Sequence, residues 1–278
     1  MARIDSHQHF WQFDPVKDSW ITDDMSVIQR DFLPHDLQPL LAENNFDGCI
    51  TVQSDQSEEH NAFLSGLAND NNFIKGIVGW TDLQADKIED RLAHYRTFKK
   101  LKGFRHVLQG EADRSLMLHP KFMNGISKLQ QYNFTYDILI FPDQLQYIPE
   151  FVSAFPEQKF VIDHIAKPAI KEGKIDGWKK DMQAVASYEN VWCKISGMVT
   201  EADWKNWQPS DFAPYLDVVT EAFGTKRIVY GSDWPVCLVA GSYNEMLAIV
   251  TSYFTAFSAD ERSAFFGGNA ASFYNLTD

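Results

Sequence analysis

The chain has 278 residues, of which 45% are apolar and 23% charged, and its formal net charge is −13. A protein this acidic, with no stripe of Lys and Arg, repels a phosphate backbone, so nucleic acid is excluded as an expected partner. Three cysteines without CxxC spacing argue against a disulfide scaffold, and no apolar run approaches the roughly 18 residues of a membrane span. We therefore expect a cytoplasmic protein with no membrane partner.

Eight short apolar, β-branched segments are predicted as strands. In chain order they are residues 2–7, 47–53, 74–80, 102–107, 134–140, 159–165, 190–196 and 227–232. Several are nearly continuous apolar runs, which is typical of parallel strands buried on both faces.

Between the strands, apolar residues recur at steps of three and four, which predicts helices. The segments with this pattern include 33–45, 87–100, 122–133, 145–156, 178–190 and 213–224. After the last strand, residues 242–258 are predicted as a long helix, and residues 265–276 as a terminal helix capped by Asn269.

This alternation, the strand count and the length predict one (β/α)₈ (TIM) barrel domain over residues 1–278. A doubly wound open sheet is the competing architecture, but no GxGxxG follows the first strand. The loops 13–30 and 199–209 are long for connections in a barrel and carry Trp20, Trp204 and Trp207. We expect them to act as lids.

Two histidines, His7 and His9, lie two positions apart on the first predicted strand, so their imidazoles project to the same side. Reactive residues of such barrels stand at the carboxyl ends of the strands. The polar or aromatic residues there are His7, His9, Gln53, Trp80, Arg105, His106, Asp137, His164, Lys194 and Asp233.

The three imidazoles and the carboxylate of this set suit a divalent ion, with zinc favoured. The same groups can also work without metal, with Asp233 as general base and the histidines orienting water or polarising a carbonyl. Both alternatives stay open.

Structural roles compete with each functional one. The two strand histidines could be hydrogen-bonded core residues, Arg105 an ion-paired core residue, and Lys194 a partner of Asp137 inside the barrel. Alternation along a strand places Asp163 on the opposite side from His164. The remaining histidines are expected at the surface or at helix caps: His35, His60, His94 and His119.

Six motifs along the chain together resemble the amidohydrolase superfamily, and more narrowly its amidohydrolase-2 branch of sugar-acid lactonases (L-fuconolactonase-like and L-rhamnonolactonase-like proteins). They are HQH at 7–9, GFRH at 103–106, DHIAKP at 163–168, KISG at 194–197, YGSDWP at 230–235 and GNAASFY at 268–274. The resemblance implies a (β/α)₈ hydrolase in which Asp233 activates the attacking water beside His7, His9 and His164.

The resemblance also bears on the cofactor. The carboxylated lysine and the additional strand histidine that hold two metals in binuclear members have no clear counterpart in this chain. At most one divalent ion is therefore expected, with His7, His9, His164 and Asp233 as its ligands, and the lactonase branch includes members that work without metal.

The predicted reaction is the opening of a sugar-acid lactone. Water deprotonated by Asp233 attacks the ester carbonyl, and protonated Asp233 returns the proton to the leaving alkoxide. The oxyanion is stabilised by Arg105, His106, a histidine of the first strand or a bound Zn²⁺.

A ring with apolar C–H faces and hydroxyls suits an aromatic pocket that also carries polar groups. The expected substrate-binding residues are Trp11, Gln53, Trp80, Arg105, His106, Lys194 and Trp234. An aldonolactone such as L-fuconolactone or L-rhamnonolactone is the expected substrate. The alternatives are a zinc-dependent decarboxylase of an unsaturated carboxylic acid and a non-catalytic sugar-binding barrel, and a homodimer stays open.

Overall fold

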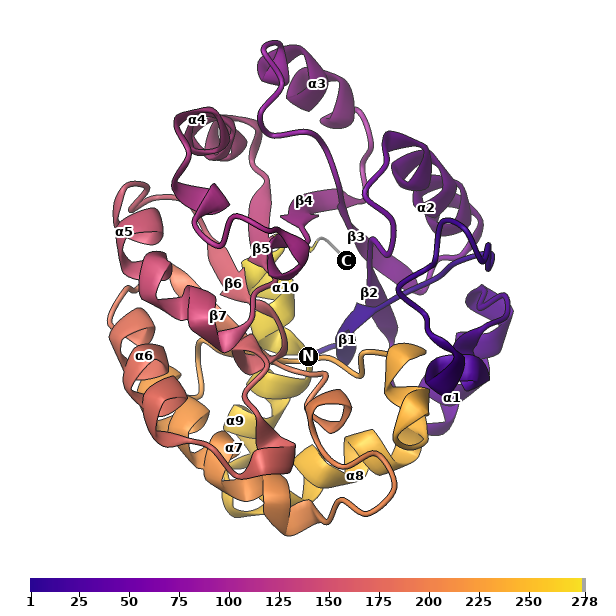
Figure 1. Ribbon diagram of the computed structural model, residues 1–278. Coiled ribbons are helices and arrows are strands. Elements are labelled where there is room, and N and C mark those ends of the chain that lie inside the picture. The colour runs from indigo at the N-terminus through magenta and orange to yellow at the C-terminus, as the bar shows by residue number, and fades with distance from the viewer. Residues whose placement is uncertain (277–278) are drawn as a thin grey trace.

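The computed structural model describes residues 1–276, so the last two residues of the predicted domain lie outside the described residues. Eight parallel strands follow one another around a barrel in chain order (Figure 1). They are β1 (Ile4–Gln8), β2 (Gly48–Val52), β3 (Ile74–Gly79), β4 (Leu101–His106), β5 (Thr135–Ile138), β6 (Phe160–Ile162), β7 (Val191–Ile195) and β8 (Ile228–Tyr230). The predicted (β/α)₈ architecture is confirmed, and the open sheet is wrong.

The barrel closes beyond the ends of its first and last strands. The backbone N–H of His9 donates to the carbonyl of Trp234 at 2.7 Å, and the N–H of Asp233 donates to the carbonyl of His7 at 2.8 Å. An isolated parallel bridge joins Gln8 to Trp234 at the same place. The main chain therefore holds His7, His9 and Asp233 in fixed relative positions.

Helices surround the barrel (Figure 1). They are α1 (Pro34–Glu43), α2 (Glu58–Asp70), α3 (Ile88–Tyr95), α4 (Pro120–Leu129), α5 (Ile148–Ser153), α6 (Asp176–Ala186), α7 (Pro209–Phe223), α8 (Tyr243–Tyr253), α9 (Ala259–Ser263) and α10 (Asn269–Phe273). Proline occupies the first position of α1, α4 and α7, where its missing N–H costs no hydrogen bond. Ser57 and Ser242 cap α2 and α8 with their hydroxyls. No helix among residues 1–276 is both long and apolar enough to cross a bilayer.

The interior of the barrel is filled by apolar side chains near its amino-terminal end. Ile4, Ile50, Val78, Val161 and Val229 from the strands pack with Ala270, Phe273 and Tyr274 of the chain's last turns. Helix α10, in yellow, accordingly lies across one end of the barrel in Figure 1. His7, His9 and Asp233 lie toward the opposite, carboxyl end of the barrel.

The expected cap at Asn269 is wrong. Residue 268 already has helical geometry, and a π-helical turn over 264–268 precedes it. The Asn269 amide instead donates to the carbonyls of Thr225 and Ile228, both at 2.8 Å, and so ties the terminal helix to the start of β8.

Candidate active site

Three imidazoles converge on one carboxylate oxygen at the carboxyl end of the barrel. Asp233 Oδ1 lies 3.4 Å from His9 Nε2, 3.8 Å from His7 Nε2 and 3.9 Å from His164 Nε2. The two histidines of β1 stand 3.2 Å apart at their Nε2 atoms, as expected for neighbours on one face of a strand. All four side chains are buried.

The backbone around two of these groups adopts left-handed geometry. Residues 164–167 have φ values of 53°, 48°, 58° and 51°, and Asp233 has φ of 58°. Non-glycine residues pay about 1–3 kcal/mol for sparsely populated backbone geometry, and such residues cluster at functional sites. This part of the chain is therefore held in place by its surroundings.

The same turn corrects the expectation for Asp163. Because β6 already ends at Ile162, the alternation of a strand does not continue through Asp163 and His164. Both side chains reach the barrel interior: Asp163 Oδ1 lies 3.4 Å from His7 Nδ1, and His164 Nδ1 lies 2.9 Å from Ser196 Oγ.

Gly197 explains the last position of the KISG motif. Its φ is +58°, and a Cβ there would lie 2.4 Å from His164 Nδ1 and 3.1 Å from Asp233 Oδ2. Any larger residue must push the imidazole aside or leave the left-handed conformation.

We expect Gly197→Ala to lower turnover by about 10²-fold, since a displacement of about 1 Å at a reacting group can have that effect. Initial hydrolysis rates and melting temperature should be measured together. Gly177→Ala in α6 is the matched control, because a Cβ there meets nothing within 4 Å. Unchanged turnover in Gly197→Ala would contradict the placement of His164.

A cluster of buried charges lies directly beneath the histidines. Lys194 Nζ donates to Asp137 Oδ2 at 2.5 Å and to His7 Nδ1 at 3.1 Å, and it forms an ion pair with Asp163 Oδ1 at 3.0 Å. Arg105 Nη1 donates to Asp163 Oδ2 at 3.1 Å and lies 3.3 Å from His7 Nε2. Two cations thus balance two carboxylates, and the pairing of Lys194 with Asp137 that the sequence left open is present.

These surroundings set the protonation of the site. Burial, aided by the charge of Lys194, holds the pKa of His7 well below its usual range, and burial does the same to the pKa of His164 against the pull of Asp233. Burial opposes ionisation of Asp233, but His164 and His9 outweigh it and lower the pKa of that carboxyl. At neutral pH the imidazoles of His7 and His164 are therefore neutral and the carboxyl group of Asp233 is ionised, which is the state that a general base requires.

A cavity of about 330 Å³ lies above this cluster. Its lining comes from β4 and from the segments that follow β1, β2, β4, β5, β6 and β8. The lining residues are His9, Lys17, Trp20, Ser54, Asp55, Gln56, Arg105, Val107, Gln109, Leu139, His164, Lys167, Asp233 and Val236. Of the predicted substrate-binding residues, Arg105 lines this cavity.

The other predicted substrate-binding residues lie around the cavity without lining it. Trp80 Nε1 donates to His106 Nδ1 at 3.2 Å, and His106 Nε2 lies 2.7 Å from Glu111. Gln53 donates to the carbonyl of Arg105 at 3.2 Å, while Lys194 is fully buried.

Two predicted tryptophans are packed into the structure. Trp234 packs edge-on against Phe10 and Phe32. Trp11 donates to the carbonyl of Arg30 and lines a smaller neighbouring cavity. The substrate role of these residues stays a prediction.

The sequence analysis missed several lining residues. Lys17 joins Trp20 from the 13–30 loop, whose unusual length was the available signal, while Ser54, Asp55 and Gln56 directly follow the strand-end residue Gln53. Among the described residues, none of 199–209 lines the cavity. That loop contributes Glu201, which pairs with Lys167 at 3.2 Å.

One histidine departs from the expected surface or capping position. His35 and His94 are exposed, and His119 pairs with Asp113 at the surface. His60 is half-buried, and its ring lies beside Ser54 in the wall of the smaller cavity.

The donor set fits one divalent cation. One ligand atom from each of His7, His164 and Asp233 lies within 4.8 Å of the others, and imidazole nitrogen and carboxylate oxygen are common ligands of zinc. His9 Nε2 adds a fourth donor beside them. The ammonium of Lys194 and the guanidinium of Arg105 reduce the attraction for any further positive charge.

The chain is similar to known proteins over its whole length. A family model described as amidohydrolase (Amidohydro_2) matches residues 4–276. The L-fucono-1,5-lactonase of Burkholderia multivorans is 40% identical, with 99% of this chain and 97% of the relative covered, and that of Burkholderia ambifaria is 35% identical, with 99% and 96% covered. A crystal structure of an amidohydrolase from Burkholderia multivorans with bound zinc superposes with a TM-score of 0.97 at 40% identity, covering 100% of both chains.

Proposed function

The chain belongs to the amidohydrolase family, and from this premise we propose that it is a hydrolase that opens a sugar-acid lactone with Asp233 as general base. The full-length similarity to two L-fucono-1,5-lactonases supports an aldonolactone substrate, with L-fucono-1,5-lactone the first choice. The observation that carries the proposal is the convergence of three imidazole Nε2 atoms on Asp233 Oδ1 at the floor of the cavity.

The reaction needs an ionised base and a donor for the oxyanion. Asp233 accepts a proton from water, which attacks the lactone carbonyl, and the negative charge develops on the carbonyl oxygen. Arg105 lines the cavity beside His7 and supplies a cationic donor for that oxygen. Protonated Asp233 then gives its proton to the ring oxygen as the C–O bond breaks, so no covalent enzyme intermediate forms.

A panel of sugar lactones assayed with a pH indicator tests this proposal, because each turnover releases a proton. We expect the fastest hydrolysis with six-carbon aldonolactones. Release of bicarbonate from an unsaturated carboxylic acid would favour the decarboxylase alternative, and lactone binding without turnover would favour a non-catalytic barrel.

A divalent ion, when bound, would be held by His7, His9, His164 and Asp233, and would polarise the carbonyl and lower the pKa of a bound water. We expect elemental analysis of the purified protein to find no more than one equivalent of zinc or another divalent metal per chain, because the donors form one cluster with two cations beside it. Asp233→Asn should lower that content. Two tightly bound equivalents per chain would contradict this arrangement.

A further inference from the structure

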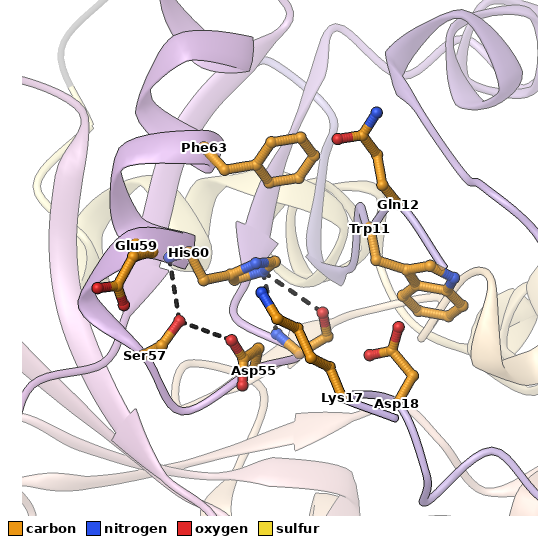
Figure 2. A pocket seen from close by; sticks show the side chains of 10 residues that line it. Trp11, Gln12, Lys17, Asp18, Asp55, Ser57, Glu59, His60 and Phe63 are labelled. Carbon is orange, nitrogen blue, oxygen red and sulfur yellow. Dashed lines mark hydrogen bonds between the residues drawn. The ribbon is translucent and has the colours of Figure 1, made fainter. Parts of the chain in front are cut away.

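A second cavity, of about 200 Å³, opens beside the first, between the loop after β1 and the start of α2 (Figure 2). Lys17, Ser54 and Asp55 line both cavities. The two cavities therefore adjoin at these three residues. The proposed reaction at Asp233 does not use this space.

His60 is fixed at the inner wall of the side cavity. Ser57 Oγ accepts from the backbone N–H of His60 at 3.2 Å and donates to Asp55 Oδ2 at 2.6 Å (Figure 2). These contacts cap α2 and leave the imidazole with its Nε2 3.4 Å from the backbone N and from Oγ of Ser54. Burial lowers the pKa of His60 to about 4, against the opposing charge of Asp55. A neutral imidazole both donates and accepts, as does the hydroxyl of a sugar.

The remaining walls combine flat apolar surface with polar groups. Trp11 and Phe63 supply aromatic faces, while Gln12 and Glu59 supply an amide and a carboxylate (Figure 2). The carboxylates of Asp18, Asp55 and Glu59 outnumber the single ammonium of Lys17, which disfavours an anionic ligand. The same polar groups disfavour a purely apolar ligand. A neutral chain of hydroxylated carbons fits both kinds of wall, because it presents C–H surface and hydroxyls together. The volume accommodates several groups of the size of water.

We propose that the side cavity binds the hydroxylated carbon chain that extends beyond the ring of a 1,4-lactone, and that His60 selects for lactones that carry such a chain. A 1,5-lactone such as L-fucono-1,5-lactone carries only a methyl group at that place. This inference rests on the proposed lactonase activity and assigns a specificity role to a residue away from the reacting atoms. It predicts that changing the side cavity lowers kcat/KM for a lactone that carries the exocyclic carbon chain, and has little effect on a lactone that lacks it.

Two 1,4-lactones with the same configuration at C2 and C3 provide the test: a six-carbon aldonolactone with two carbons beyond the ring, and a tetronolactone with none. We expect His60→Ala to lower kcat/KM for the six-carbon lactone by about tenfold, the effect of one lost neutral hydrogen bond, and to leave the tetronolactone within about twofold. Phe63→Trp, which fills the cavity, should have the same selective effect. His94→Ala in α3 is the control and should change neither rate.

The tetronolactone rate reports the integrity of the catalytic centre in each preparation. Equal losses on both substrates, or no loss on either, would overturn the assignment of the side cavity. If the wild-type protein hydrolyses neither these lactones nor any other in the panel, the proposed function itself is wrong and the subsite with it. A selective loss supports both.

Discussion

Asp233→Asn is expected to lower kcat for lactone hydrolysis by at least about 10²-fold, with a smaller change in KM. The amide keeps the shape of the side chain but cannot take a proton from water, and general base catalysis contributes about 10²–10⁴-fold. The backbone N–H of residue 233 still bonds to the carbonyl of His7, so the barrel closure is preserved. Steady-state rates and melting temperature should be measured on the same samples.

The control for this variant is another aspartate that faces a histidine. Asp113 Oδ2 lies 2.7 Å from His119 Nε2, and both side chains are 46% exposed to solvent. Neither residue lines the cavity. Asp113→Asn should leave the rate unchanged. If Asp233→Asn hydrolyses lactones as fast as the wild-type protein, Asp233 is not the base and the carboxylate serves another purpose.

The barrel and the pair His7 and His9 could be predicted because both depend on periodicity. Eight apolar segments separated by amphipathic ones leave few architectures, and alternation along β1 places the two imidazoles on one side. The charge pair of Lys194 and Asp137 could be named for a similar reason, since both lie on strands. These predictions were possible because strands and helices repeat their side-chain directions regularly.

Irregular backbone limited the rest. The left-handed run over 164–167 brings Asp163 and His164 to the same interior, and no hydrophobic pattern in the sequence signals this turn. Strand-end position alone also selected Trp80 and Gln53, which do not line the cavity, because the segments that follow the strands supply most of its lining. The course of the 13–30 loop, which supplies Lys17 and Trp20, depends on tertiary contacts.

The charge cluster beneath the histidines separates an apolar half of the barrel from a polar half. The amino-terminal half is apolar and is closed by α10, while the carboxyl-terminal half holds His7, His9 and Asp233. Between them, Lys194 contacts Asp137, Asp163 and His7 in full burial. Tyr274 of the terminal segment also donates to Asp137 Oδ2 at 2.8 Å. The ammonium thus links the closure of the barrel to the position of His7.

Lys194→Met is accordingly expected to lower the free energy of unfolding by about 3–5 kcal/mol at pH 8, the range for removing one partner of a buried ion pair. Asp163 would then keep Arg105 as its cation, while Asp137 would keep only the hydroxyl of Tyr274. Urea unfolding followed by circular dichroism measures the change, which should appear as a lower midpoint with an unchanged slope.

The loss should depend on pH in a defined direction. Burial already raises the pKa of Asp137 to about 6 in the folded protein, and without the ammonium that pKa rises further. A folded state that binds more protons than the unfolded state loses stability as pH increases, so the deficit of Lys194→Met should be smaller at pH 5 than at pH 8. Wild-type protein should show the weaker dependence.

A second substitution separates loss of charge balance from loss of packing. In Lys194→Met/Asp137→Leu the unpaired carboxylate is gone, so part of the stability should return, and the cycle of single and double variants measures the coupling between the two residues. If Lys194→Met costs under about 1 kcal/mol, or if the double variant is less stable than the single one, the ammonium does not hold the two carboxylates together. His7 would then have to be positioned by Arg105 and the strand alone.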